Sequence, residues 1–239
     1  MTVIDITHQI PAHDVRAGSL ALWRAAPWLV PGVILAVVDP GVGSARRAVA
    51  VEVGAAAAVL VGPDNGILLP AIISLGPITG AVELAGPTSG AADGRGVTFA
   101  GRDILARASA ELAKGVELHR LGSAIDAEGL VGTPLPRAEA DPDGRLRTEV
   151  LWVDHFGNAQ LNACPADVAH LGPVVEVRVA RGSWPARLVG TYAAIDRAAV
   201  GLVTDSYGLL AISGNGASAA ALTGLRSGDE VWLGRWSGE

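Results

Sequence analysis

The sequence predicts an α/β protein: an N-terminal α/β layered domain with a mostly parallel sheet, followed by a small C-terminal domain of the β-barrel type. In the first part, apolar runs of strand length alternate with segments of helical periodicity. In the second part, short strand-like runs recur at regular spacing and helical signals are few. Half of the 239 residues are hydrophobic, yet aromatic residues make up only 4%. Small aliphatic side chains and frequent glycines suit closely packed layers.

The N-terminal domain, predicted over residues 1–135, begins with segments of clear periodicity. Residues 2–7 alternate like a strand. Residues 13–29 carry apolar side chains at helical spacing, which predicts a helix. Asp14 is placed near its expected N-terminus, where the helix dipole stabilises a negative charge. Residues 32–39 form a nearly continuous apolar run, which predicts a strand covered by protein on both faces.

Two further strands and a helix complete this domain. Residues 47–53 are one predicted strand, and the apolar run that ends at Gly62 is the next. That run leads into a turn rich in Pro, Asp, Asn and Gly. Helical periodicity over residues 101–115 predicts a helix, with Gly115 as its C-terminal cap.

The amino-acid composition changes near residues 133–145. This segment is rich in proline and acidic side chains and has little apolar periodicity, so we expect a linker there. The C-terminal all-β domain is predicted over residues 147–239. Its strands are expected at residues 147–154, 174–180, 184–190, 201–213 and 229–236. Helical signals there are confined to residues 164–172 and 215–222.

Composition excludes several classes of function. The formal net charge of −6 argues against a nucleic-acid surface, because such surfaces need clustered positive charge. The single cysteine, Cys164, excludes an intramolecular disulfide and fits a reducing compartment. No segment approaches the roughly 20 uninterrupted apolar residues of a membrane span, and the N-terminus lacks a signal-peptide pattern. We expect a soluble, cytoplasmic protein that binds neither nucleic acid nor membrane.

The segment VVDPGVGSARRAVAV (residues 37–51) places a carboxylate and two guanidiniums around a glycine-containing loop between two predicted strands. Asp39 lies where the first strand ends, which is where open α/β sheets bind their ligands. Arg46 and Arg47 lie where the next strand begins. Taken alone, Asp-Pro-Gly is also common turn chemistry, so Asp39 as a cap of backbone N–H groups is an alternative. The segment lacks the Gly-Lys-Ser/Thr ending of a phosphate-binding loop.

Four further loops carry polar side chains that also have structural explanations: turns in the first and fourth, a helix cap in the second, and a surface hydrogen-bonding histidine in the third. They are GPDNGIL (residues 62–68), VTFAGRD (97–103), WVDHFGNAQLN (152–162) and TDSYGLLAISGNGASA (204–219). No His and Cys residues have metal-ligand spacing, and no Gly-x-Ser-x-Gly nucleophile elbow occurs. Each loop by itself is therefore a weak functional signal.

Taken in order, these loops and VIDITHQIPAHDVRAGSLAL (residues 3–22) closely resemble the S-adenosyl-L-methionine hydrolase (adenosine-forming) family. Its members are also called S-adenosyl-L-methionine (SAM) hydroxide adenosyltransferases, and they are related to the fluorinase and chlorinase, which attack the same molecule with halide. The resemblance covers nearly all 239 residues. It implies an α/β N-terminal domain joined to a β-barrel-like C-terminal domain. It also implies a homotrimer, with the site between the N-terminal domain of one subunit and the C-terminal domain of a neighbour.

In the family, an acid, an arginine and a histidine organise a water that displaces methionine from the 5′ carbon of the ribose. The resemblance matches Asp39 to the acid and Arg46 to the arginine. Methionine leaves the sulfonium as a neutral thioether, so the reaction needs an oriented water and no acid for the leaving group. SAM is then the substrate, and neither a cofactor nor a metal is expected. The substrate-binding residues that the resemblance implies are Phe99, Asp154, Phe156, Asn158, Ser206, Tyr207, Asn215 and Gly216.

These residue types suit the parts of the substrate. The carboxylate of Asp154 suits the methionine ammonium, and Asn158 can both donate to and accept from an adenine edge. Gly216 lets a backbone group approach the base. We therefore predict that the two C-terminal loops line one pocket.

The sequence departs from the family pattern in two places. The family histidine lies in the segment Thr-Phe-His-Gly-Arg-Asp, and here that position is Ala100. Family members also carry an earlier strand with a Thr-Asp-Phe-Gly-type motif, and this chain begins after it. We expect an unpaired sheet edge as a result, through truncation or as a natural remnant.

The leading hypothesis is hydrolysis of SAM to adenosine and L-methionine, impaired by Ala100 and the missing first strand. One alternative is a non-catalytic protein that binds SAM or adenosine and keeps the C-terminal adenine pocket without the histidine. Another is a SAM-dependent halogenase. The halogenating relatives carry Tyr and hydroxyl or small residues in place of the acid and the valine of the Asp-Pro-Gly-Val-Gly segment, whereas Asp39 and Val42 resemble the hydrolases.

Overall fold

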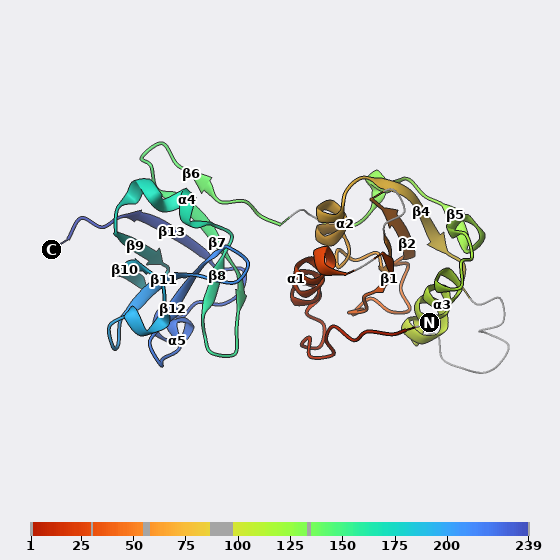
Figure 1. Ribbon diagram of the computed structural model, residues 1–239, viewed down its shortest axis with the longest axis horizontal. Helices are drawn as coiled ribbons and strands as arrows, with labels where there is room; N and C mark the ends of the chain where they lie inside the picture. The colour runs from red at the N-terminus through yellow and green to blue at the C-terminus, as the bar shows by residue number, and fades with distance from the viewer. Residues whose placement is uncertain (1, 30, 55–57, 87–97, 133–134, 239) are drawn as a thin grey trace. The chain divides into compact units, whose positions relative to one another are not determined.

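The computed structural model describes residues 2–29, 31–54, 58–86, 98–132 and 135–238. The chain divides into two compact units, Met1–Pro134 and Leu135–Glu239 (Figure 1). Each unit has a hydrophobic core of its own: two apolar clusters in the first, and one in the second. Each unit therefore buries its apolar side chains within itself.

The first unit contains a mixed five-stranded sheet in the order β1-β3-β2-β4-β5. Its strands are β1 (Gly32–Leu35), β2 (Ala48–Val53), β3 (Ala58–Pro63), β4 (Ile78–Leu84) and β5 (Gly122–Ala124). Of the pairings described in this sheet, β1–β3 is parallel and the others are antiparallel. The α/β class is confirmed, but the expected mostly parallel sheet is wrong. Only four residues join β2 to β3, and a parallel connection needs a crossover of about a dozen residues or more.

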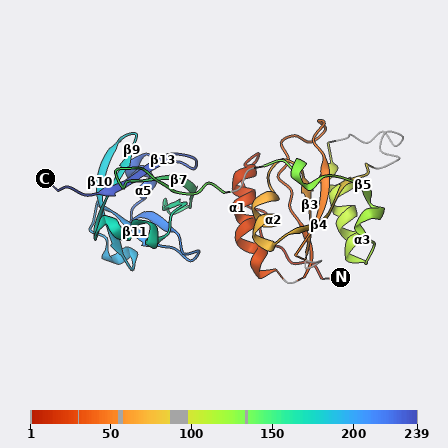
Figure 2. The same cartoon turned by 90° about the horizontal axis from the view of Figure 1, so that it is seen from above.

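Helices cover both faces of this sheet (Figure 2). They are α1 (Val15–Ala25), α2 (Leu69–Leu75), a π-helical turn (Gly101–Ala106) and α3 (Arg107–Ala113), with 3-10 turns at Ala26–Trp28, Leu118–Arg120 and Ala127–Gly129. Helices α1 and α2 lie on one face and α3 on the other. Successive side chains of strand β2 point to opposite faces of the sheet, so β2 contributes to the apolar core on each face. Val49 and Val51 belong to the core on the α1 and α2 side, and Ala48 and Ala50 belong to the core beside α3.

Three local predictions have clear outcomes in this unit. Asp14 caps α1 as predicted, because its Oδ1 accepts a hydrogen bond of 2.8 Å from Ala17 N. Residues 2–7 are exposed and form no strand, since alternation makes a strand only where a neighbour completes the backbone hydrogen bonds. Strand β1 has four residues, and Gly32 and Leu35 at its two ends are exposed. The expectation of a fully covered strand over residues 32–39 is therefore wrong.

The second unit is a closed seven-stranded barrel in the order β13-β9-β10-β11-β12-β8-β7, closed by the pairing of β13 with β7. The predicted barrel-like domain is confirmed. Its strands are β7 (Leu146–Val153), β8 (Ala159–Leu161), β9 (Val174–Val179), β10 (Gly182–Val189), β11 (Val200–Thr204), β12 (Leu210–Gly214) and β13 (Glu230–Arg235), with β6 (Glu139–Ala140) added beside β7. Helices α4 (Pro165–Val168) and α5 (Ala219–Thr223) and 3-10 turns at Ala169–Leu171 and Tyr192–Ala194 complete it. Side chains such as Val150, Val177 and Leu233 are fully buried and belong to its core.

Across the parts of both units that the structure describes, no helix has the length and apolar character needed to cross a membrane.

Candidate active site

The connection from β1 to β2 carries the two predicted catalytic side chains, Asp39 and Arg46. It folds into a compact turn in which Val42 N donates a hydrogen bond of 3.3 Å to the Asp39 carbonyl. Ser44 Oγ donates to the Gly41 carbonyl at 2.7 Å and accepts from Arg46 N at 3.3 Å. These local bonds curl the chain so that two side chains seven positions apart meet.

Asp39 and Arg46 form a buried ion pair. Arg46 Nη2 donates to Asp39 Oδ2, and the side chains are 10% (Arg46) and 7% (Asp39) exposed. Asp39 Oδ1 and Arg46 Nε are also buried, and neither makes a hydrogen bond to any residue that the structure describes. Beside the ion pair, therefore, one acceptor and one donor have no hydrogen-bond partner among the described residues. Such a combination can orient a water or a polar ligand.

The position matched to the family histidine, Ala100, immediately precedes the π-helical turn and is 8% exposed. A Cβ added to the next residue, Gly101, would lie 3.4 Å from Val37 Cγ1. This turn therefore packs against the segment that leads into Asp39. A methyl group occupies the position, and it can neither donate nor accept a proton.

Phe99 lies just before the same turn, and its side chain is 56% exposed. The guanidinium of Arg102 lies 4.7 Å from the centroid of its ring. Arg102 also pairs with Asp103 at 2.6 Å, and the hydrogen bond and charge of Asp103 raise the pKa of Arg102. Phe99 is thus an exposed aromatic side chain beside a fixed cation.

In the second unit, Asp154 and Asn158 shape the turn between β7 and β8. Asp154 Oδ1 accepts hydrogen bonds from Phe156 N at 2.9 Å and from Asn158 N at 2.8 Å, and its Oδ2 accepts from Asn158 Nδ2 at 2.8 Å. The side chain of Phe156 is 68% exposed. The carboxylate of Asp154 therefore helps to form this turn, a role that the sequence analysis did not consider.

The β7–β8 turn also contacts the chain that follows β12. Ala220 N donates to the Gly157 carbonyl at 2.9 Å. Gly157 has a φ of +85°, and a Cβ there would lie 2.0 Å from Ser218 Oγ. Asn215 and Gly216 lie in this same segment, between β12 and α5. The structure thus brings two of the predicted loops together.

Ser206 and Tyr207 lie in the turn between β11 and β12. Asp205 Oδ1 accepts a hydrogen bond from Tyr207 N at 2.8 Å, and its Oδ2 accepts one from Gln160 Nε2 on β8. This turn precedes β12, whereas Asn215 follows it. The two predicted groups therefore lie at opposite ends of a strand that spans roughly 17 Å, and a ligand that touches both must be elongated.

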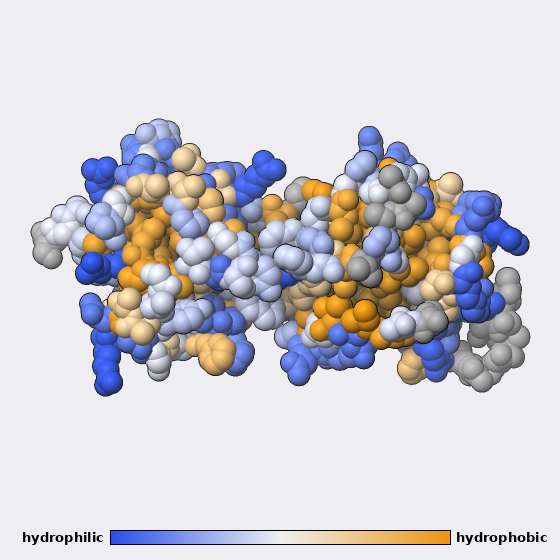
Figure 3. Space-filling model, in the orientation of Figure 1, coloured by the Kyte–Doolittle hydropathy of each residue, from blue (hydrophilic) through white to orange (hydrophobic). Residues whose placement is uncertain are grey.

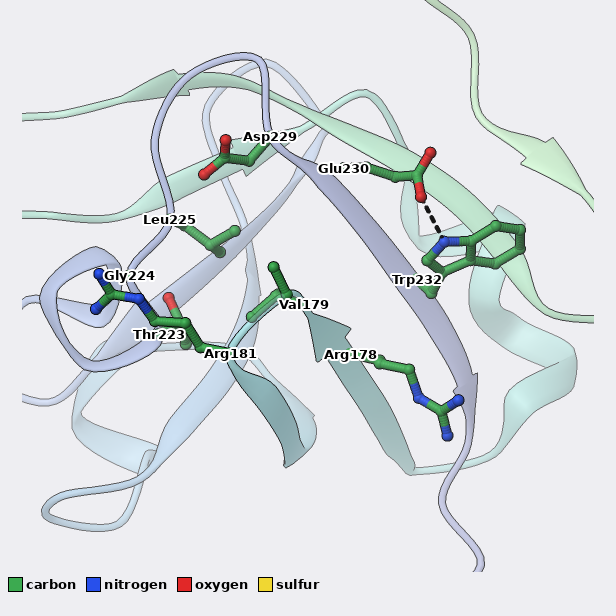
Figure 4. A pocket seen from close by; sticks show the side chains of 10 residues that line it. Arg178, Val179, Arg181, Thr223, Gly224, Leu225, Asp229, Glu230 and Trp232 are labelled. Atoms are coloured by element: carbon green, nitrogen blue, oxygen red, sulfur yellow. Dashed lines mark hydrogen bonds between the residues drawn. The ribbon is translucent and has the colours of Figure 1, made fainter.

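The cavities described in the structure lie elsewhere. One, of about 410 Å³, lies in the second unit. Its lining includes Val179, Leu225 and Trp232 (Figure 4). A second, of about 250 Å³ in the first unit, is lined by residues such as Arg107 and Arg120. None of the predicted site residues lines either cavity. Within the described ranges, no three or more His, Cys, Asp and Glu side chains gather as a metal site requires.

The sequence analysis assigned no role to three residues near the ion pair: Arg47, Asp64 and Asn65. They bond to one another or to backbone groups next to Asp39 and Arg46. Arg47 Nε donates to Asp64 Oδ2 at 2.8 Å. Asn65 Nδ2 donates to the carbonyl of Val38 at 2.8 Å. The available signal was the Pro-Asp-Asn-Gly turn directly after a buried strand, but turn chemistry alone also explains that pattern.

Most of the chain matches two family models. Residues 1–122 match the SAM hydroxide adenosyltransferase N-terminal domain, and residues 148–232 match the C-terminal domain. The (R)-S-adenosyl-L-methionine hydrolase of Salinispora tropica is 44% identical, with 96% of this chain and 85% of that protein covered. The (R)-S-adenosyl-L-methionine hydrolase of Thermus thermophilus is 39% identical, with 97% and 87% covered. The fluorinase of an Actinoplanes species is 26% identical, with 95% and 86% covered.

Solved structures share the architecture of both units. An uncharacterized conserved protein from Thermotoga maritima is 29% identical and superposes with a TM-score of 0.83, with 98% of this chain and 89% of that chain covered. A conserved hypothetical protein from Thermus thermophilus is 34% identical with a TM-score of 0.75, with 97% and 87% covered. Both domain models match in order, and hydrolases of the same name align along nearly the whole length. The chain therefore belongs to the SAM hydroxide adenosyltransferase family.

Proposed function

We propose that this protein hydrolyses SAM to adenosine and L-methionine. Its relatives at 39% to 44% identity are named hydrolases, and the relative named fluorinase is less similar at 26%. The observation that carries the proposal is the buried Asp39–Arg46 pair, which leaves Asp39 Oδ1 and Arg46 Nε without a hydrogen bond to the described protein. A fixed carboxylate beside a fixed guanidinium is suited to holding a water.

The proposed step is an in-line displacement at the 5′ carbon of the ribose. The water oxygen forms a bond to this carbon as the bond from carbon to sulfur breaks, and the electron pair of the broken bond stays on sulfur. The sulfonium becomes the neutral thioether of methionine, so no proton goes to the leaving group. The attacking water loses a proton to form the 5′-hydroxyl of adenosine, and the carboxylate of Asp39 accepts that proton. The positive charge of Arg46 favours the hydroxide character of the water.

The remaining predicted residues bind the substrate in this proposal. They are Phe99, Asp154, Phe156, Asn158, Ser206, Tyr207, Asn215 and Gly216. SAM is elongated, with adenine and methionine on opposite sides of the ribose. Asp154 and Asn158 are hydrogen-bonded to each other beside the segment that follows β12, whereas Tyr207 lies at the other end of that strand. Within one chain, therefore, Ser206 and Tyr207 do not share a pocket with the other predicted residues of this unit.

We also propose that the protein assembles as a homotrimer, as the family resemblance implies. Large apolar side chains are exposed in both units, for example Trp28 at 85% and Phe156 at 68%. Covering such side chains is the usual driving force for association.

The test is to incubate the purified protein with SAM and to separate adenosine and methionine by chromatography. Asp39→Asn keeps the shape of the side chain but removes its charge, so we expect the rate to fall by about 10²- to 10⁴-fold. Asp143→Asn is the matched control, because that side chain is 80% exposed and has no part in the proposed site. Its rate is expected to equal that of the unmodified protein.

Other outcomes identify the alternatives. Saturable binding of SAM without release of adenosine contradicts the hydrolase and indicates a binding protein. A halide-dependent 5′-halogenated adenosine as the product indicates a halogenase.

A further inference from the structure

One neighbouring turn, the Pro-Asp-Asn-Gly turn at the end of β3 (residues 63–66), bonds to backbone groups beside both members of the Asp39–Arg46 pair. We infer that Asn65 is a positioning residue for this pair, and that the Asp64–Arg47 ion pair anchors the turn from which it acts. The inference rests on the proposed function. It names the residues that set the geometry of the two groups proposed to bind the water.

Asn65 fixes the chain at Asp39. Its Nδ2 donates a hydrogen bond of 2.8 Å to the carbonyl of Val38, the residue directly before Asp39. Its Oδ1 accepts a bond of 3.2 Å from Ile67 N, which orients the amide within its own turn. The bond to Val38 joins positions 27 residues apart, so it ties the Asp39 turn to the end of the neighbouring strand β3.

The same turn fixes the chain at Arg46 through the carbonyl of Arg47. That carbonyl accepts a bond of 2.9 Å from Arg46 Nη1 and a second, also of 2.9 Å, from Asp64 N. The guanidinium of Arg46 is thus held on one side by Asp39 and on the other by a backbone group that residue 64 holds in place. Two adjacent residues, Asp64 and Asn65, therefore determine where both partners of the ion pair lie.

Asp64 anchors the turn and is not a second catalytic carboxylate. Its side chain is 3% exposed, and its Oδ2 accepts from Arg47 Nε at 2.8 Å and from Arg47 Nη2 at 2.5 Å. Its Oδ1 accepts from Val131 N at 2.7 Å, and Arg47 Nη2 also donates to the Gly129 carbonyl. Both oxygens accept hydrogen bonds from the protein, whereas Asp39 Oδ1 accepts none from the described residues.

A small displacement of this turn changes the reaction geometry, because in-line attack requires the water to be held on the axis of the breaking bond. A misplacement of about 1 Å can reduce a rate by about 10²-fold even when the mutated residue does not touch the substrate. Asn65 contacts a backbone carbonyl of the catalytic turn, so its loss is expected to lower kcat and leave the binding of adenosine unchanged.

The test uses Asn65→Asp and Asn65→Ala. Asp keeps the size of the side chain and the acceptor for Ile67 N but replaces the donor to Val38 with a carboxylate oxygen, which repels that carbonyl. We expect kcat to fall by about 10²-fold, with the affinity for adenosine, measured by calorimetry, unchanged. Asn65→Ala removes the donor without adding a charge and is expected to lower kcat in the same direction. Asn162→Asp is the matched control, because Asn162 Oδ1 accepts a backbone N–H in the same way but lies in the second unit.

A double variant separates positioning from a general loss of structure. If Asn65 acts through the ion pair, Asn65→Asp has little further effect once Arg46 has been replaced by Ala, since residues that act as a unit are non-additive. An equal fold-loss in both backgrounds, or an unchanged kcat in Asn65→Asp, overturns the inference while the unmodified protein still releases adenosine. If the unmodified protein releases none, the proposed function fails and the crystal structure of Asn65→Asp decides the positioning role. An intact Asp39–Arg46 contact in that structure contradicts it, and a separated pair supports it.

Discussion

The pair formed by Asp39 and Arg46 is unusual because it is buried and yet incompletely hydrogen-bonded to the described protein. A buried donor or acceptor that stays unpaired costs about 1–3 kcal/mol of stability. This cost disappears when a water or a substrate atom bonds to Asp39 Oδ1 and Arg46 Nε. The two atoms are therefore better explained by a ligand than by the needs of the fold.

Ala100 gives the sharpest prediction for a single residue. Its side chain is buried at the start of the π-helical turn, which packs beside the segment that leads into Asp39. Ala100→His adds a group that can exchange a proton with the water, and such groups contribute about 10²- to 10⁴-fold. We expect a rise of this size in the rate of adenosine release, with SAM bound equally well.

The control for this change is Ala113→His, at the exposed end of α3, which is expected to leave the rate unchanged. Replacing Arg46 by Ala in the Ala100→His protein should remove most of the gain. Equal rates with and without the histidine would show that position 100 has no part in the chemistry.

The family resemblance predicted that Asp39 and Arg46 act together, and the structure places the two side chains in contact; their catalytic roles stay predictions. The sequence was not sufficient for Asn65 and Asp64. Their partners are backbone groups 27 and 67 residues away, and a bond to a carbonyl or an N–H group leaves no signature in the partner's side chain. The functional roles assigned to Asp154 and Tyr207 stay predictions.

At the scale of elements, the sequence predicted the N-cap of α1 and the β-barrel correctly, but it did not predict how the strands of the first sheet pair. The N-cap of α1 at Asp14 follows from its own side chain, and the β7–β13 barrel follows from repeated short strands. The direction of strand pairing depends on the connections, and the short link between β2 and β3 made the sheet mixed. Residues 2–7 have a strand pattern but no strand, because pairing requires a partner as well as a pattern.

Replacing Gly157 by Ala tests the contact between the β7–β8 turn and the segment before α5. A side chain at φ +85° is strained, and its Cβ would also lie 2.0 Å from Ser218 Oγ. Gly144 has a similar φ of +77° but has open space around it. We expect Gly144→Ala to lower the free energy of unfolding by about 1–2 kcal/mol through backbone strain alone. Gly157→Ala is expected to lose about 1–3 kcal/mol more through overpacking.

Denaturant unfolding followed by circular dichroism measures both variants. A Gly157→Ala protein as stable as Gly144→Ala would contradict the close approach of the two segments. Because the proposed substrate loops meet here, Gly157→Ala is also expected to weaken the binding of adenosine more than Gly144→Ala does.

At the scale of the whole molecule, the two units have separate cores, so neither needs the other to bury its apolar interior. Both units nevertheless expose large apolar side chains, including Ile4 at 68% and Trp28 at 85% in the first. Figure 3 shows apolar surface on the visible face of each unit. Exposed apolar side chains of this size are typical of surfaces that associate.

The final prediction is the mass of the protein in solution. A homotrimer covers these side chains in repeated interfaces and, by the family resemblance, brings residues of different subunits to one site. Light scattering at micromolar concentration is expected to give three times the 24.2 kDa of the chain. The rate of adenosine release per subunit should then fall on dilution, at the concentration where the scattered mass falls. A mass of one chain with full activity would contradict the trimer and would require each chain to complete the site alone. A trimer whose activity persists after dissociation would separate assembly from catalysis, and the exposed apolar side chains would then serve association only.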